Sequence, residues 1–422
     1  MPILKCLSLR VAACSTLPLV AFTASSVSAE GFFEDSSAKL DMRNFYLNRD
    51  FRDGSGQNKR EEWAQGFILN LRSGYTAGTV GFGVDALAML GVRLDSSPDR
   101  TGTGLLPTHK DSGRAAGEYS KLGLTAKARV SNSELKVGTL IPKLPTVQPN
   151  DGRILPQVFR GGQLTSKEWD GLTVNAGRLN RVTAREETHT QKLALNNKNR
   201  RFSGAVESDY FDFAGVDYAF TPGLTGSYQL ARLDDVYRQQ FFGLQHAIKV
   251  GEGTFKSDVR LSVSDDQGRS LGGDVDNRAL NGMFTYSQNG HSLGGGYQRM
   301  FGDTGFAYIN GTNPYLVNFL QLNDFAQAKE RSWQARYDFN FATLGVPGLT
   351  FMTRYVNGSH AEYATAGKDG REWERNIDVQ YQVQSGPLKN VGLRWRHASY
   401  RSTFARGMDE HRVIVSYSVP IW

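Results

Sequence analysis

The chain has 422 residues, including 46 glycines, 24 phenylalanines and 17 tyrosines, and a formal net charge of +7. Its mean hydropathy is −0.42, and after the first 30 residues no run of about 20 apolar residues occurs, which excludes a helical membrane protein. Both cysteines, Cys6 and Cys14, lie before residue 30, so disulfides are not expected to hold the rest of the chain together.

Residues 1–29 have the three parts of a secretory signal peptide. A basic start is followed by an apolar stretch over residues 11–22 and by a typical cleavage site at residues 27–29 (VSA). We therefore expect the chain to be exported and residues 1–29 to be removed. Residues 30–422 are then expected to form a single domain.

Large apolar residues occupy every second position in segments along the whole remaining chain, which predicts β-strands with one apolar face. In one segment the apolar positions are Trp63, Phe67, Leu69 and Leu71, and in another they are Trp333, Ala335, Tyr337, Phe339 and Phe341. Such segments are longer than the usual ~5–6 residues of soluble sheets and match the ~9–11 residues that a tilted strand needs to cross a bilayer. The alternation therefore favours a transmembrane β-barrel over a soluble sandwich.

Short and long connections alternate between these segments. Tight links are expected near residues 76–78, 131–132, 169–171, 221–223, 251–253, 288–290, 344–347 and 385–387. Long polar segments are expected at residues 50–61, 95–118, 141–159, 181–206, 234–239, 265–276, 302–330, 358–371 and 401–410. Eight short periplasmic turns and nine long outer loops predict an all-β, antiparallel barrel of about 18 strands with both chain ends in the periplasm.

If the apolar positions face lipid, the positions between them face the inside of the barrel. Arg394, Arg396 and Arg412 then project inward from the last two strands, and a group of cations in a narrow tube attracts anions. Further inward-facing candidates are Arg72, Lys121, Lys127 and Arg129. The alternative is that these cations are solvated residues that merely pair with Asp85, Asp378 or Glu374.

Residues 141–159 contain four prolines, Pro142, Pro145, Pro149 and Pro156, together with Arg153. Proline cannot continue a strand ladder and fixes a bent path, so this loop is a candidate for folding inward and narrowing the pore. The alternative is a stiff loop on the surface.

Several short blocks resemble the OprD-type porin family, and they extend over the whole chain after residue 30. The blocks are residues 31–36 (GFFEDS), 43–46 (RNFY), 48–50 (NRD), 79–85 (TVGFGVD), 153–157 (RILPQ), 332–337 (SWQARY), 346–351 (VPGLTF) and 384–387 (QSGP). The resemblance implies an 18-stranded barrel in the outer membrane of a Gram-negative bacterium, with an inward-folded third loop. It also implies diffusive uptake of small carboxylate-bearing nutrients past a ladder of basic residues.

By these motifs, the ladder is expected to comprise Arg49, Arg60, Arg153, Arg394, Arg396 and Arg412. One ladder position departs from the family, because Gln380 stands where lysine is often found. Residues 302–314 contain a single acid, Asp303, with Ala307 where an acid is expected in members that take basic amino acids, and residues 30–422 are short for that branch. These two points favour the branch that handles simple or aromatic monocarboxylates. A channel for basic amino acids or small peptides is the alternative.

The expected partners follow from the same interpretation. They are small carboxylate substrates, outer-membrane lipid and lipopolysaccharide, and the barrel-insertion machinery, whose terminal aromatic signal Trp422 resembles; the barrel is expected to be a monomer or a loose trimer. Neither nucleic acid nor a cofactor is expected, because no phosphate-binding glycine motif occurs. The histidines lack metal-ligand spacing. A barrel enzyme is a remote alternative that rests on His397 and Ser399, two positions apart.

Overall fold

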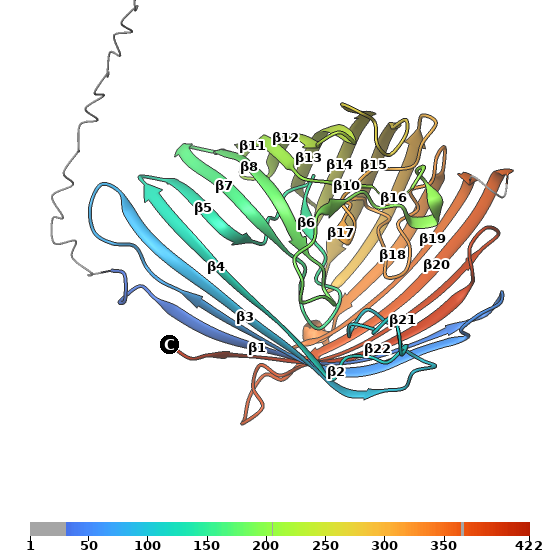
Figure 1. Ribbon diagram of the computed structural model, residues 1–422, viewed down its shortest axis with the longest axis horizontal. Helices are drawn as coiled ribbons and strands as arrows, with labels where there is room; N and C mark the ends of the chain where they lie inside the picture. Colours follow the sequence, from blue (N-terminus) through green and yellow to red (C-terminus); the bar gives the residue numbers. More distant parts are fainter. Residues whose placement is uncertain (1–30, 205, 364–366) are drawn as a thin grey trace, which may run out of the picture.

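Almost every strand in the structure pairs with the strands that come before and after it in the sequence. The structure is a computed structural model that describes residues 31–204, 206–363 and 367–422. Eighteen antiparallel strands form one sheet, and the pairing of β1 (Ser37–Phe51) with both β2 (Lys59–Arg72) and β22 (Met408–Pro420) closes it into a barrel (Figure 1). The proposed signal peptide, residues 1–29, lies outside the described residues.

The other barrel strands follow in chain order, and most have the length needed to cross a bilayer at a tilt. They are β3 (Gly81–Ser96), β4 (Glu118–Val130), β5 (Ser133–Leu140), β7 (Val158–Trp169), β8 (Leu172–Thr183), β11 (Phe211–Thr221), β12 (Leu224–Leu233), β13 (Tyr237–Val250), β14 (Gly253–Asp266), β15 (Asp276–Gln288), β16 (His291–Phe301), β18 (Arg331–Asn340), β19 (Leu349–Tyr363), β20 (Gly367–Gln382) and β21 (Gly392–Ser402). The predicted barrel and its strand number are confirmed.

Four short strands lie in the loops rather than in the wall. β6 (Gln148–Pro149) pairs with β17 (Thr312–Asn313), and β9 (Leu193–Ala194) pairs with β10 (Glu207–Ser208). Two 3-10 helices, η1 (Lys198–Arg200) and η2 (Phe341–Leu344), complete the described elements. No helix within the described ranges is long and apolar enough to cross a membrane.

The eight tight links all fall where the sequence predicts them, between consecutive strands. One is built from Asn289 (φ 50°) and Gly290 (φ 82°), which connect β15 to β16. Positive φ at both positions matches the two-residue hairpin turn that Asn-Gly favours, because its twist fits that of the flanking strands.

Several of the long segments are shorter than predicted. Residues 358–371 were expected to be a loop, but β19 continues to Tyr363 and β20 begins at Gly367, with shifts in register after Gly358. Residues 234–239 reduce to a three-residue link, and β22 begins at Met408 rather than after residue 410. The alternation of apolar residues did not predict these strand ends because they are polar. Strands that extend beyond the membrane into water need no apolar face.

The alternation divides the wall into two faces as expected. On β4, Leu122 is 72% exposed and Leu124 is 60% exposed, whereas Lys121 and Thr125, which have the opposite strand parity, are buried. The apolar positions therefore form the outer surface, and the buried positions lie beneath loops that enter the barrel (Figure 1).

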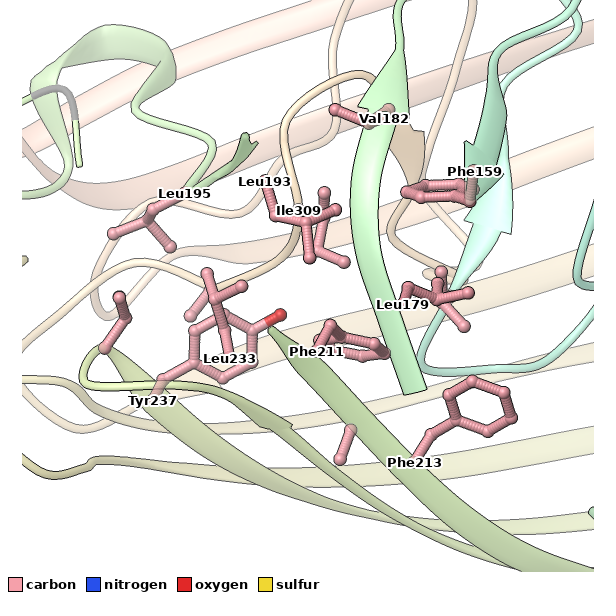
Figure 2. Close-up of a cluster of buried hydrophobic side chains, with 14 of the residues drawn as sticks. Phe159, Leu179, Val182, Leu193, Leu195, Phe211, Phe213, Leu233, Tyr237 and Ile309 are labelled. Carbon is pink, nitrogen blue, oxygen red and sulfur yellow. The ribbon is translucent and has the colours of Figure 1, made fainter. Parts of the chain in front are cut away.

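The apolar core lies inside the barrel, between these loops and the wall. In one cluster, Phe159, Leu179, Phe211 and Tyr237 from the wall surround Ile309 from the loop of residues 302–330 (Figure 2). A second cluster packs Leu105, Ile154 and Leu155 from two loops against Phe45 and Leu47 of β1. The loops are thereby fixed inside the barrel.

Candidate functional site

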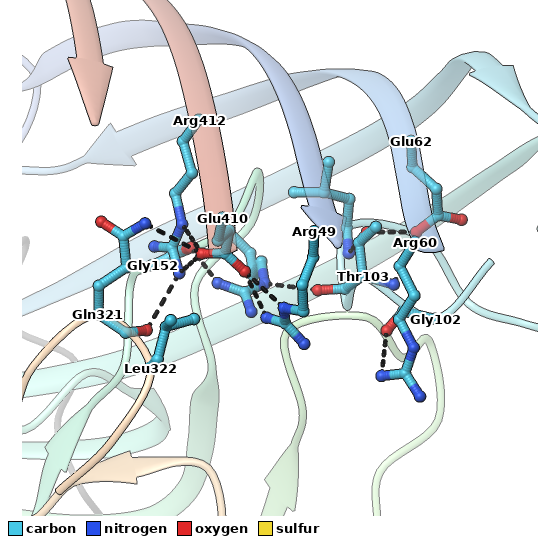
Figure 3. A network of polar contacts seen from close by, with 12 residues as sticks. Arg49, Arg60, Glu62, Gly102, Thr103, Gly152, Gln321, Leu322, Glu410 and Arg412 are labelled. Atoms are coloured by element: carbon cyan, nitrogen blue, oxygen red, sulfur yellow. Dashed lines mark hydrogen bonds and ion pairs between the residues drawn. The ribbon is translucent and has the colours of Figure 1, made fainter. Parts of the chain in front are cut away.

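The strand register places five arginines on adjacent strands at one side of the barrel. Arg60 on β2 lies opposite Arg49 on β1, and Arg412 on β22 lies opposite both Leu47 of β1 and Arg396 of β21. Arg394 follows two positions earlier on β21, on the same inner face. With Arg153, which reaches the group from the loop of residues 141–157, these residues are called the arginine row (Figure 3 labels Arg49, Arg60 and Arg412).

Glu410 is the carboxylate at the centre of the row. Its Oε2 accepts from Arg49 Nε at 2.7 Å, and its Oε1 accepts from Arg412 Nε at 2.6 Å. The side chains of Glu410 and Arg412 are 0% and 3% exposed. One buried carboxylate thus orients two arginines through charge-assisted hydrogen bonds.

Arg153 and Arg60 are held mainly by backbone carbonyls, which supply no counter-charge. Arg153 Nε donates to the Thr103 carbonyl at 3.0 Å, and Arg60 Nη1 donates to the Gly102 carbonyl at 3.0 Å (Figure 3). Burial lowers the pKa of the Arg153 guanidinium well below its usual value, and the nearby cation Arg412 lowers it further. The arginine row therefore lacks negative charge around Arg153 and Arg60 and is suited to receiving an anion.

Asp378 on β20 holds the other end of the row. Arg394 Nε donates to Asp378 Oδ1 at 2.8 Å, and Arg396 Nε lies 3.0 Å from Asp378 Oδ2 without the alignment of a hydrogen bond. These arginines and Arg412 line a cavity of about 240 Å³, whose other walls include Phe45, Ile414 and Gln380. The cavity combines cationic and apolar surfaces.

Arg43 on β1 also lines this cavity, and the sequence interpretation missed it. Its two terminal nitrogens contact Asp151 at 2.8 and 3.0 Å, and it donates to the Arg153 carbonyl. Arg43 therefore ties the loop of residues 141–157 to the wall. The signal was present, because Arg43 has the same strand parity as Arg49, but Phe45 and Leu47 at that parity are apolar and obscured it.

The second group of predicted inward-facing cations lies apart from the row. Arg72 and Lys127 line a cavity of about 610 Å³ beside Pro142, near the short-turn end of the barrel. Lys127 Nζ pairs with Asp85 at 2.6 Å, as the alternative proposed, and Arg129 stacks over Tyr75 at 4.2 Å.

Lys121 is committed to loop backbone. Its buried ammonium donates to the carbonyls of Pro156 at 3.2 Å and Arg185 at 2.9 Å. Lys121 therefore anchors two loops and has little capacity left for a solute.

The proline-containing loop lies inside the barrel. Pro142 and Pro149 are buried and Pro145 is half-buried, and β6 joins the loop to β17 of the loop of residues 302–330. Gly66 on β2 permits the close approach, since a Cβ there would lie 2.8 Å from the Ile154 carbonyl oxygen.

The loop of residues 302–330 reaches the arginine row from the opposite side. Glu374 accepts from the backbone N–H groups of Gln321 and Leu322 at 3.1 Å each, and of Asn323 at 2.9 Å. Gln321 Nε2 donates to Glu410 at 3.1 Å, and its carbonyl accepts from Arg412 at 3.2 Å. Glu374 therefore anchors a loop rather than neutralising an arginine.

His397 and Ser399 do not form a catalytic arrangement. His397 Nε2 lies 3.1 Å from Ser399 Oγ, but His397 Nδ1 has no partner among the described residues, whereas an activated serine needs an orienting group there. His397 instead stacks on Trp395 at an interplanar angle of 10° on the outer face. Within the described ranges, no three His, Cys, Asp or Glu side chains are grouped to hold a metal ion.

A closed antiparallel barrel with an apolar outer face and polar loops inside defines a transmembrane β-barrel channel. Residues 30–421 match the outer membrane porin family OprD, and the chain belongs to that family. It is therefore an outer-membrane porin of a Gram-negative bacterium, in a family of channels rather than of enzymes.

The chain is similar to several proteins of Pseudomonas along most of its length. It is 39% identical to the porin-like protein GalP of Pseudomonas putida, over 96% of each chain. The solved structure of Pseudomonas aeruginosa OccK9 (OpdG) has a TM-score of 0.90 and 50% identity, covering 93% of this chain and 100% of that one. Pseudomonas aeruginosa OpdK, solved with vanillate, has a TM-score of 0.87 and 41% identity at the same coverage.

Proposed function

We propose that the protein is a selective channel through which small carboxylate-bearing solutes cross the outer membrane along the arginine row. Residues 1–29 would direct its export, and the barrel-insertion machinery would place residues 30–422 in the membrane. The observation that carries this proposal is the 240 Å³ cavity, where Arg394, Arg396 and Arg412 lie beside Phe45 and Ile414.

The charges of this region favour anions. The arginine row and Arg43 contribute seven cations, and the carboxylates that contact their side chains directly are Asp151, Asp378 and Glu410, an excess of four positive charges. In a narrow tube of low dielectric, such an excess raises the local concentration of anions. Guanidinium groups also match the planar geometry of a carboxylate.

The row suits transport because no single site need hold the solute tightly. Adjacent strands lie about 4.8 Å apart, so a carboxylate can pass from one guanidinium to the next without full rehydration. Phe45 and Ile414 offer apolar contact to the rest of the solute. The vanillate bound to the related OpdK, an aromatic carboxylate, supports this class of substrate.

Basic amino acids are disfavoured by the composition of the loop of residues 302–314. Asp303 is 81% exposed and pairs with Lys329 at 3.1 Å, and Ala307 is fully buried. The loop of residues 302–314 therefore offers no free carboxylate to the pore.

The proposal is tested by uptake into liposomes that contain the purified protein. We expect vanillate to enter at least ~10-fold faster than vanillyl alcohol, which has the same ring without the charge. Equal rates would contradict carboxylate selectivity, and faster entry of arginine than of vanillate would favour the basic-amino-acid alternative.

A further inference from the structure

Arg375 lies on the lipid-facing side of the barrel. Arg375 lies between Trp373 and Ile377 on the outer face of β20, whereas Glu374 and Asn376 are buried inside. Arg375 is exposed, and its side chain forms no hydrogen bond or ion pair within the described residues. An unpaired charge on the lipid face is unfavourable unless it reaches an anion at the membrane surface.

The position of Arg375 directs it to the outer leaflet. The rings of Trp333, Tyr355 and Trp373 follow one another across three strands, with centroids 5.6 and 5.9 Å apart. Such aromatic rings mark the headgroup level, and they lie toward the long-loop end of these strands. Arg375 is two positions nearer the membrane centre than Trp373, so its long side chain can extend back to the headgroups.

Two further arginines lie at this level and share one carboxylate. Arg52 Nε donates to Asp409 Oδ2 at 2.6 Å, and Arg401 Nη1 donates to Asp409 Oδ1 at 2.9 Å. Ser399 is opposite both Arg375 and Asp409 in the register, so the backbones of Arg375 and Asp409 are about 10 Å apart. A phosphate between them could contact Arg375 and Arg401 together.

The neighbouring charged residues do not cancel the positive charge of Arg375, Arg52 and Arg401. Asp50 lies opposite Asp409 and Lys59 in the register, and Glu61 pairs with Lys59 at 2.8 Å and Arg100 at 2.9 Å. The patch then contains five cations and three carboxylates. The cations are Arg52, Arg375, Arg401, Lys59 and Arg100, and the carboxylates are Asp50, Glu61 and Asp409. The patch thus keeps an excess of two positive charges, which complements a phosphate monoester.

An apolar furrow of about 530 Å³ begins beside Arg375 on the outer wall. Its floor is formed by small residues, Gly295, Ala335 and Thr353, between the rings of Tyr337 and Tyr355. A Cβ added at Gly295 would meet no atom within 4 Å, so this part of the wall is open. The furrow has the character needed to receive an acyl chain.

We propose that Arg375, Arg401 and Arg52 bind a phosphate of lipid A, the anchor of lipopolysaccharide, with one of its acyl chains in the furrow. The unpaired arginine and the furrow lie side by side, as the headgroup and chain of one lipid do. The excess positive charge favours lipid A over a zwitterionic phospholipid.

Native mass spectrometry of the protein in detergent, titrated with bisphosphorylated lipid A, tests this site. Wild-type protein is expected to bind one lipid A at least ~10-fold more tightly than Arg375→Gln does. Lipid A from which both phosphates have been removed should bind wild-type protein as weakly as intact lipid A binds the variant. Arg375→Lys should retain part of the affinity.

The matched control is Arg238→Gln, because Arg238 is an exposed arginine on the distant strand β13 and pairs with Asp265 at 3.5 Å. This control should bind lipid A as wild type does. Equal lipid A binding by Arg375→Gln and wild type, or equal binding of phosphatidylglycerol and lipid A by wild type, would overturn the proposal. Unchanged single-channel conductance of Arg375→Gln establishes that the barrel is folded and keeps this test independent of the pore.

Discussion

Arg396 on β21 lies directly opposite Arg412 on β22. Like charges in this position normally destabilise a sheet, so the pair needs compensation. Asp378 lies 3.0 Å from Arg396, and Glu410 lies 2.6 Å from Arg412, on opposite sides of the pair. The two carboxylates hold the arginines in place, and both guanidinium groups still line the 240 Å³ cavity.

Replacing Glu410 with glutamine should destabilise the barrel and make the pore more selective for anions. The substitution leaves Arg49 and Arg412 without their shared counter-charge, and loss of one partner of a buried pair costs on the order of 3 kcal/mol. Urea unfolding in lipid vesicles measures the change in free energy. The control Glu61→Gln, at the outer rim, should cost less than about 1 kcal/mol, and equal losses for both variants would refute this role of Glu410.

Replacing Arg43 with glutamine should widen the pore. Arg43 connects β1 to Asp151 and to the Arg153 carbonyl, so its loss frees this part of the inward-folded loop. We expect a higher single-channel conductance with more frequent transitions between levels. Lys39→Gln removes the same charge from the same face of β1 without a loop contact, and conductance traces that match those of Arg43→Gln would count against the tether.

The buried pair of Arg201 and Asp324 should keep the loop between β8 and β11 attached to the loop of residues 302–330 at acidic pH. Burial by itself raises the pKa of Asp324, but Arg201 at 2.5 Å and Lys198 outweigh it and hold that pKa well below its usual range. Because the folded pKa is depressed, the contribution to stability is present above the ordinary carboxyl pKa. It is lost only when the pH falls through the lower folded value.

Wild-type channels should therefore remain quiet between pH 7 and about pH 4, near the ordinary carboxyl pKa. Asp324→Asn should show loop-driven current noise throughout this range, as recorded in planar bilayers. Asp303→Asn alters an exposed acid of the same loop and should behave like wild type. Noise in wild type that begins near pH 4 would show that Asp324 titrates normally.

The wall of the barrel was predictable because a single rule repeats along it. Trp333, Ala335 and Tyr337 alternate with polar residues, and the membrane on one side and water on the other require this alternation. The inward direction of Arg394, Arg396 and Arg412 follows from the same rule. The strand register also follows once the links are short, as at Asn289-Gly290.

The partners of the inward-facing residues could not be predicted in the same way. Alternation places Lys127 and Asp85 on one face, but their contact depends on register, and the anchoring of Lys121 depends on the path of two loops. Glu410 was expected at the end of a loop, so its central position was missed. Arg375 has the parity of the outer face and did not stand out among apolar neighbours.

The central claim is that the arginines of β21 and β22 attract anions into a water-filled pore. The reversal potential across a bilayer with a KCl gradient measures this directly in the variant Arg394→Gln/Arg396→Gln/Arg412→Gln. We expect the anion-to-cation permeability ratio to fall at least ~10-fold. The control Arg238→Gln/Arg269→Gln/Arg371→Gln, which removes three exposed charges at the outer rim, should leave it unchanged. A folded triple variant with the permeability ratio of wild type would contradict the account.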